Sequence, residues 1–233
     1  MIDRLRDSSL VKLLYCYLSL VFALLLTSRL FSLLLGSRLD QPFWSALYNL
    51  CAYGLALTLC IWVPHRYFKD WRTSREELGL TGLPTWTDLG LALVGFFVYI
   101  LLSGALTSLF ELLPWFDATQ AQDVGFTAVY SLPDRFFTLL ALVVIAPIAE
   151  EILMRGWLYG KLRARLPLVV ALLLVSLLFA FLHGQWNVAV DVFALSVVVC
   201  SLREITGTIY AGTALHLLKN LLAFYLLYLA VFA

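Results

Sequence analysis

The feature that most constrains this chain is a series of long apolar runs, each near the length that crosses a membrane. A helix needs about 20 predominantly apolar residues to span the hydrocarbon core of a bilayer. Runs of this kind cover residues 10–35, 45–64, 87–113, 136–162, 166–183, 188–202 and 207–232. The sixth is short and is interrupted by Asp191, so it is the weakest of the series. The pattern predicts an all-α, polytopic transmembrane helical bundle of about seven membrane helices, or roughly six to eight.

The composition agrees with a membrane protein. Hydrophobic residues make up 62% of the 233 residues and charged residues 13%, with a mean hydropathy of +0.92, which is more apolar surface than a soluble domain of this length buries. No basic patch with interleaved aromatic residues is present, so nucleic acid is not an expected partner. We find no internal repeat and no linker, and residues 1–233 are therefore predicted to form a single transmembrane domain.

The basic residues are distributed unevenly between the two sides that such a bundle would have. If the N-terminus is inside, the outer connections hold two basic residues, Arg38 and Arg135. The inner connections then hold Arg4, Arg6, Lys12, Arg66, Lys69, Arg72, Arg75, Lys161, Arg163, Arg165 and Arg203. Cytoplasmic loops carry the excess of positive charge. The chain is therefore predicted to be an integral membrane protein with a cytoplasmic N-terminus, and seven crossings would place its C-terminus outside.

Polar side chains gather at membrane depth in the last four runs. Insertion of each charged side chain into the membrane costs at least about 2.5 kcal/mol on insertion scales. Such groups are therefore expected to have a structural or functional role. Glu151 and Arg155 are four residues apart, share a helix face and can pair. Glu150 points about 100° away from Glu151 and must find its partner on another helix. The whole set is Glu150, Glu151, Arg155, His183, Asp191, His216, Lys219 and Asn220.

Each of these residues also has a purely structural interpretation. A Glu-Arg pair can hold a helix in place, a histidine at a helix end can sit in the headgroup region, and His216 with Asn220 can bond two helices together. Lys219 is expected to snorkel or pair, and Asp191 to cap or hydrogen-bond within the bundle. Their concentration in one half of the chain, however, is typical of a functional site.

The residue types indicate hydrolysis. A buried carboxylate and one histidine can take a proton from water, and a second histidine with a carboxamide can donate hydrogen bonds to a developing oxyanion. His216 and Asn220 are four residues apart, so both can point at one place in the bundle. No serine or cysteine lies near these residues in sequence to suggest a nucleophile. Peptide or ester hydrolysis by activated water is the chemistry that this set favours.

Three motifs stand in order: Glu150-Glu151-Ile-Leu-Met-Arg155, Phe179-Ala-Phe-Leu-His183 and His216-Leu-Leu-Lys-Asn220. Together they resemble the CAAX prenyl proteases of the CPBP (Abi) intramembrane protease family, over a protease-like core of about residues 130–225. The stretch RTSREELGLTGLPTW is similar to the segment that often precedes this core.

The resemblance implies a role for each residue. Glu150 and His183 would activate the attacking water, and His216 and Asn220 would stabilise the oxyanion. Glu151 and Arg155 would hold the helix and tune the pocket. Phe179 would pack beneath His183. The choice of Glu150 over Glu151 as the base comes from the resemblance.

Two questions about this site stay open from the sequence. Glu150, His183 and His216 could supply three ligands to a zinc ion with water as the fourth. The HExxH spacing is absent, so we favour a glutamate-type mechanism without a cofactor. We expect an intramembrane endopeptidase acting on a membrane-associated peptide or protein in the lipid bilayer. The alternatives are a metal-dependent form of it, a proton-coupled carrier, and a non-catalytic immunity or interaction protein.

Overall fold

The computed structural model describes residues 9–67, 73–120 and 129–230. Within these residues all regular structure is helical, and helical turns run without interruption over residues 9–40, 42–67, 86–110, 132–163, 168–181, 186–206 and 210–228. The all-α part of the predicted fold class is confirmed, and a helix lies over each of the seven predicted runs within the described residues. The sixth helix, predicted from the weakest run of the series, is present and passes through Asp191 unbroken.

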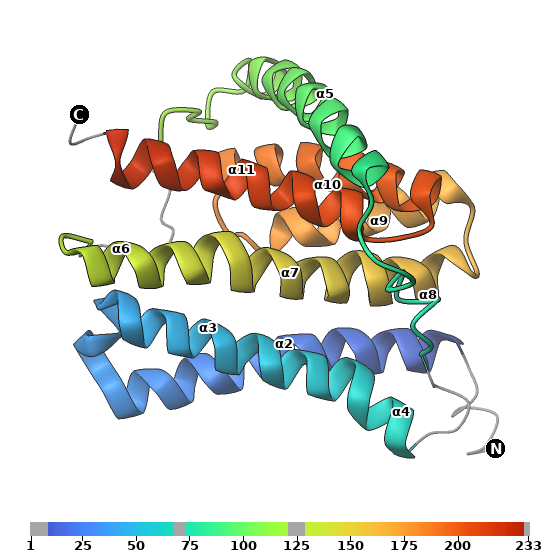
Figure 1. Cartoon of the computed structure of the whole chain (residues 1–233), viewed down its shortest axis with the longest axis horizontal. Coiled ribbons are helices and arrows are strands. Elements are labelled where there is room, and N and C mark those ends of the chain that lie inside the picture. Colours follow the sequence, from blue (N-terminus) through green and yellow to red (C-terminus); the bar gives the residue numbers. More distant parts are fainter. Residues whose placement is uncertain (1–8, 68–72, 121–128, 231–233) are drawn as a thin grey trace. The chain divides into compact units, whose positions relative to one another are not determined.

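The chain forms two compact units, whose α-helices are labelled in Figure 1. The first takes the described residues up to Ser74, from 129 to Leu153 and from Phe224 onward, and the second takes 75–120 and 154–223. The expected single domain stays a prediction. The helices of the first unit are α2 (Ser9–Leu35), η1 (Gly36–Asp40), α3 (Pro42–Leu57), η2 (Thr58–Trp62), α4 (Val63–Tyr67), α6 (Leu132–Leu139), η4 (Leu140–Ile145) and α7 (Ala146–Glu150). Those of the second are α5 (Trp86–Phe110), α8 (Gly160–Arg163), α9 (Leu168–Phe181) and α10 (Trp186–Thr206), whereas η5 (Glu151–Tyr159) and α11 (Tyr210–Tyr228) have residues in both.

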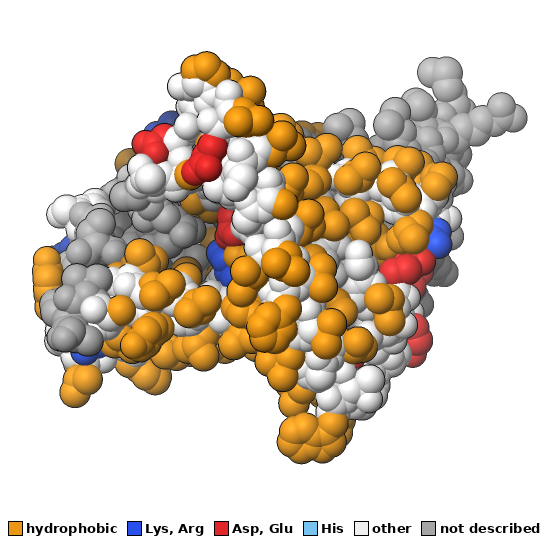
Figure 2. All heavy atoms as spheres, turned by 90° about the horizontal axis from the view of Figure 1, so that it is seen from above, with side chains coloured by type: hydrophobic (Ala, Val, Ile, Leu, Met, Phe, Trp, Pro, Cys, Tyr) orange, Lys and Arg blue, Asp and Glu red, His pale blue; other side chains and the backbone are white. Residues whose placement is uncertain are grey.

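Four helical segments are long and apolar enough to cross a membrane: Val21–Arg38, Pro42–Arg66, Trp86–Phe110 and Leu132–Arg163. The apolar helix Leu168–Phe181 is shorter. Large hydrophobic side chains are exposed along these segments, and they cover much of the face shown in Figure 2. An exposed apolar surface of this extent marks contact with a membrane or with another protein. These features indicate an integral membrane protein, whereas the predicted count of about seven crossings stays a prediction.

The predicted orientation also stays a prediction. Part of the charge count behind it falls on Arg4, Arg6, Lys69 and Arg72, which lie outside the described residues. The last predicted run, 207–232, likewise ends beyond residue 230, where the description stops.

Helix ends in both units follow local sequence signals. α5 begins with a capping box in which the Thr85 side chain accepts from the Asp88 N–H, and α6 begins with the same box at Ser131 and Asp134. α10 ends at Gly207, whose φ of +70° is a conformation that a glycine adopts without steric cost. The boundaries of these helices are therefore set by short-range hydrogen bonds.

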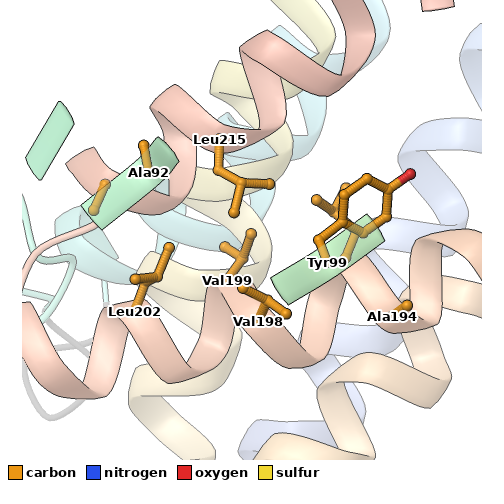
Figure 3. Close-up of a cluster of buried hydrophobic side chains, with 9 residues drawn as sticks. Ala92, Tyr99, Ala194, Val198, Val199, Leu202 and Leu215 are labelled. Atoms are coloured by element: carbon orange, nitrogen blue, oxygen red, sulfur yellow. The ribbon is translucent and has the colours of Figure 1, made fainter. Parts of the chain in front are cut away.

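In the second unit, α10 packs against both α5 and α9. A cluster of buried side chains joins α5, α10 and α11, and Figure 3 shows Ala92, Tyr99, Val198 and Leu215 within it. α5 approaches closely at Gly95, where an added Cβ would come within 2.8 Å of Leu215 Cδ1. The absence of a side chain at Gly95 therefore lets Leu215 reach the backbone of α5.

The stretch that precedes α5 docks on the second unit. Two glycines, Gly156 and Gly160, leave room for its backbone, since an added Cβ would meet Leu78 O at 2.8 Å and Glu77 O at 3.0 Å. The Ile209 N–H also donates to Gly79 O at 3.1 Å. This part of the RTSREELGLTGLPTW stretch is thus bound to η5, α8 and the start of α11.

Candidate active site

The seven predicted site residues are divided between the two units. Glu150 and Glu151 lie in the first, and the second holds Arg155, Phe179, His183, His216 and Asn220. The expected meeting of Glu150 with the histidines stays a prediction.

The segment that carries the glutamates contains two π-helical stretches. η4 is π-helical, α7 returns to the α-helix, and η5 is π-helical again. Pro147, near the start of α7, lacks an N–H, and in a regular α-helix its ring would clash with the carbonyl four residues earlier. The wider turn of η4 relieves both problems. π-helical turns inside α-helices occur frequently at functional sites.

Glu150, the last residue of α7, accepts a hydrogen bond at Oε1 from the hydroxyl of Tyr53 on α3. The two residues are 97 apart in sequence and belong to the same unit. This contact confirms the prediction that Glu150 finds a partner on another helix. A donor on one carboxylate oxygen holds the group in one orientation.

Arg155 lies over an aromatic ring. Its Cζ is 4.5 Å from the ring centroid of Phe179, and the side chain is fully buried, with 0% exposure. A desolvated cation over an aromatic face is stabilised by about 2 kcal/mol. Glu151 is also fully buried. Its predicted pairing with Arg155 joins residues of different units and stays a prediction.

Phe179 also contacts both histidines of the second unit. Its ring meets His183 edge to face at a centroid distance of 4.8 Å, and His216 in the same manner at 6.0 Å. Phe179 itself is 2% exposed. Arg155, His183 and His216, which come from three separate helical stretches, therefore converge on one buried ring.

The tautomer of His183 follows from its hydrogen bond. Nδ1 lies 2.8 Å from the carbonyl oxygen of Phe179. Because a carbonyl oxygen only accepts, Nδ1 carries the proton, and in the neutral ring Nε2 keeps the lone pair. The turn that follows α9 continues into Gly184, with a φ of +72°. Nε2 is thus the ring nitrogen of His183 that can accept a proton or bind a ligand.

His216 and Asn220 lie on α11, four residues apart, and His216 is almost fully buried. Lys219, between them, pairs with Asp191 on α10, with Nζ 3.3 Å from Oδ2. The other oxygen, Oδ1, accepts from Tyr99 Oη and Ser103 Oγ of α5, each at 2.6 Å. The predictions that Lys219 pairs and that Asp191 hydrogen-bonds within the bundle are confirmed.

Sequence reasoning did not find three of these polar partners. Tyr53, Tyr99 and Ser103 lie in the first half of the chain, well before the motifs. A tyrosine in an apolar run gives no signal by itself, because aromatic residues are common there. One feature could have indicated the α5 pair, since Tyr99 and Ser103 are four residues apart and share a helix face.

The metal alternative finds no direct support in the geometry. Within the described residues, no group of three or more His, Cys, Asp or Glu side chains is placed to hold a metal ion. The Nδ1 hydrogen bond of His183 suits a metal ligand as well as a base, because both act through the opposite ring nitrogen. The zinc alternative and the expectation of no cofactor both stay predictions.

An apolar cavity of about 300 Å³ lies in the second unit. Its walls come from α5, α9 and α10 and include Ala180, Phe181 and Trp186. Ala180 and Phe181 lie between Phe179 and His183 in sequence, so the cavity adjoins the backbone that leads to His183. Its lining offers no polar group to a ligand.

Comparison with protein families tests the resemblance noted in the sequence. Residues 132–222 match the model of the family described as type II CAAX prenyl endopeptidase Rce1-like. Residues 132–222 are an Rce1-like domain of the CPBP family. This Rce1-like domain contains all three motifs, from Glu150 to Asn220. Comparison of the chain with curated proteins and with solved structures found no match.

Proposed function

We propose that this protein is an intramembrane endopeptidase that hydrolyses a peptide bond of a membrane-associated protein or peptide. The observation that carries the proposal is the Rce1-like match over residues 132–222, which holds the three motifs in order. The family is one of CAAX prenyl endopeptidases, so a protein substrate is implied. The proposal requires that Glu150 meets the histidines in the active protein.

Glu150 and His183 activate the attacking water. The Tyr53 hydroxyl orients the Glu150 carboxylate, and the Phe179 carbonyl holds the proton of His183 on Nδ1. Water gives up a proton to the carboxylate as its oxygen bonds to the carbonyl carbon of the substrate. The same proton passes to the departing amine when the carbon–nitrogen bond breaks, as general acid–base catalysis requires.

His216 and Asn220 bind the oxyanion that develops on the substrate carbonyl. Their spacing lets two donors point to one oxygen, and the burial of His216 makes such a hydrogen bond stronger than it is in water. Arg155 and Glu151 support the site from the side, Arg155 by resting on the Phe179 ring that both imidazoles touch.

The test is cleavage of a membrane-peptide library by purified protein in liposomes. Glu150→Gln is expected to abolish cleavage, because an amide cannot take the proton from water. Glu111→Gln is the matched control: the same change at an exposed glutamate that follows α5 is expected to leave cleavage unchanged. Equal cleavage by the wild type and Glu150→Gln would contradict the proposal.

Addition of a strong chelator separates the two forms of the mechanism. Activity that survives the chelator and is lost in Glu150→Gln supports glutamate-activated water without a metal. Activity lost in both favours the zinc alternative with Glu150, His183 and His216 as ligands. Proton-dependent flux in the same liposomes, unchanged in Glu150→Gln, would favour the carrier. A cellular phenotype that Glu150→Ala leaves intact would favour the immunity or interaction protein.

A further inference from the structure

Two stripes of residues run along α11 within the second unit. Ala211, Leu215 and Lys219 follow each other at intervals of four and form one stripe, and His216 and Asn220 form the next. Neighbouring residues on a helix point about 100° apart, so the two stripes face different ways. Whatever holds the first stripe in place therefore also sets the direction of the second.

Apolar packing holds the N-terminal part of the first stripe, which is Ala211 and Leu215. Ala211 and Leu215 are both fully buried in the cluster that joins α5, α10 and α11, where Figure 3 shows Leu215 among side chains of α10. Leu215 lies against Gly95 of α5. Such packing is not directional, and a leucine tolerates a modest rotation of its helix by changing its rotamer.

The ion pair at the end of the stripe is directional. Lys219 Nζ lies 3.3 Å from Asp191 Oδ2, and its side chain is 12% exposed. Asp191 is itself held by the hydroxyls of Tyr99 and Ser103, one helical turn apart on α5. A single carboxylate thus joins α5, α10 and α11, and a rotation of α11 would separate this charge from the ammonium group of Lys219.

We propose that the Asp191–Lys219 ion pair fixes the rotation of α11 about its axis and thereby orients His216 and Asn220. Asp191 and Lys219 are positioning residues, with Tyr99 and Ser103 holding the carboxylate. The inference rests on the proposed function, in which His216 and Asn220 bind the oxyanion. Asn220 is the residue next to Lys219, so loss of the pair misplaces it directly.

The kinetic test compares Lys219→Met with Lys161→Met. Lys161 makes an ion pair of similar length, 3.4 Å to Glu77, away from α11, and its loss is expected to leave catalysis unchanged. Lys219→Met is expected to lower kcat about 10- to 100-fold with KM within about twofold, because misplacement by an ångström weakens transition-state contacts more than substrate binding. Lys219→Arg keeps the charge and is expected to restore most of kcat.

A second comparison separates positioning from simple stability. The double variant Asp191→Asn with Lys219→Met removes both charges, which often leaves stability unharmed or improved. We expect its melting temperature to recover toward wild type while kcat stays low. Recovery of both together, or a kcat that Lys219→Met does not change, would overturn the proposal. If Lys219→Met does not fold, Asp191→Asn, which keeps the shape of the side chain, takes its place.

A spectroscopic test decides the orientation without any cleavage. The chain has three histidines, so protein labelled with ¹⁵N-histidine gives few imidazole signals, which His→Gln variants assign. Lys219→Met is expected to shift the signals of His216 and to leave those of His65 in place. Unchanged His216 signals would refute the positioning role of the ion pair, whether or not the protein is a protease. The proposed protease activity is tested separately, by the loss of cleavage in Glu150→Gln.

Discussion

Tyr53 offers the sharpest test of how Glu150 is held. Its hydroxyl donates to Glu150 Oε1 from α3, and both residues belong to the same unit. Tyr53→Phe removes this one oxygen and keeps the ring, so the packing of α3 stays unchanged. The substitution therefore isolates a single hydrogen bond to a carboxylate.

The size of the effect follows from the energy of that bond. A hydrogen bond to a charged group contributes about 1.5–3 kcal/mol, and about 1.4 kcal/mol corresponds to a tenfold change in rate. If the bond holds the carboxylate in its reacting orientation, so that its energy is realised only in the transition state, its loss is expected to lower kcat/KM by about 10- to 150-fold. The residual activity should remain above that of Glu150→Gln, because the carboxylate is still present.

The assay is cleavage in liposomes, with the melting temperature of each variant measured in parallel. Tyr48→Phe is the matched control, since Tyr48 lies five residues earlier on α3 and its ring packs against Phe31 at a centroid distance of 5.4 Å. It is expected to leave kcat/KM within about twofold. A Tyr53→Phe enzyme as active as wild type, beside an inactive Glu150→Gln, would refute the reasoning that the hydroxyl orients the base.

Two further predictions concern the second unit. Gly156→Ala is expected to destabilise the protein by about 1–3 kcal/mol, because the new Cβ would meet Leu78 O at 2.8 Å. Gly104→Ala, where nothing lies within 4 Å, should not lower the melting temperature. At the end of α10, the hydrogen bond and charge of Arg163 hold the pKa of Glu204 below its usual range. Glu204→Gln should lower the melting temperature slightly at pH 7, since a partly exposed pair contributes under about 1 kcal/mol to the free energy of unfolding. Because the folded-state pKa of Glu204 is the lower one, this difference should shrink as the pH falls below about 4.3 and vanish only below the folded-state pKa, where the carboxyl group is protonated in both states.

The helices themselves were largely predictable from the sequence. The positions and lengths of the apolar runs located all seven helices. They could do so because an apolar helix is formed by consecutive residues, whose hydropathy is visible in the sequence. The sixth run was the weakest of the series because Asp191 breaks its apolar character, yet its helix passes through this residue. A carboxylate is unfavourable in an apolar helix only when it lacks partners, and Tyr99, Ser103 and Lys219 supply them.

The candidate site was predictable in its residues and not in its contacts. The spacing of four residues placed His216 beside Asn220 on one helix, whereas the position of Phe179 beneath His183 came from the family resemblance. The contact of Arg155 with Phe179 was not predicted, because it joins two different helices.

The sequence by itself determined the all-helical fold, the places of the helices and the three motifs. Tertiary structure alone decided that Tyr53 bonds to Glu150 across 97 residues and that Asp191 joins three helices. The physical reason is distance. Periodicity depends on neighbours a few residues apart, whereas a hydrogen bond forms only when helices approach to within about 3 Å at the bonded atoms, and that approach is set by packing such as Leu215 against Gly95.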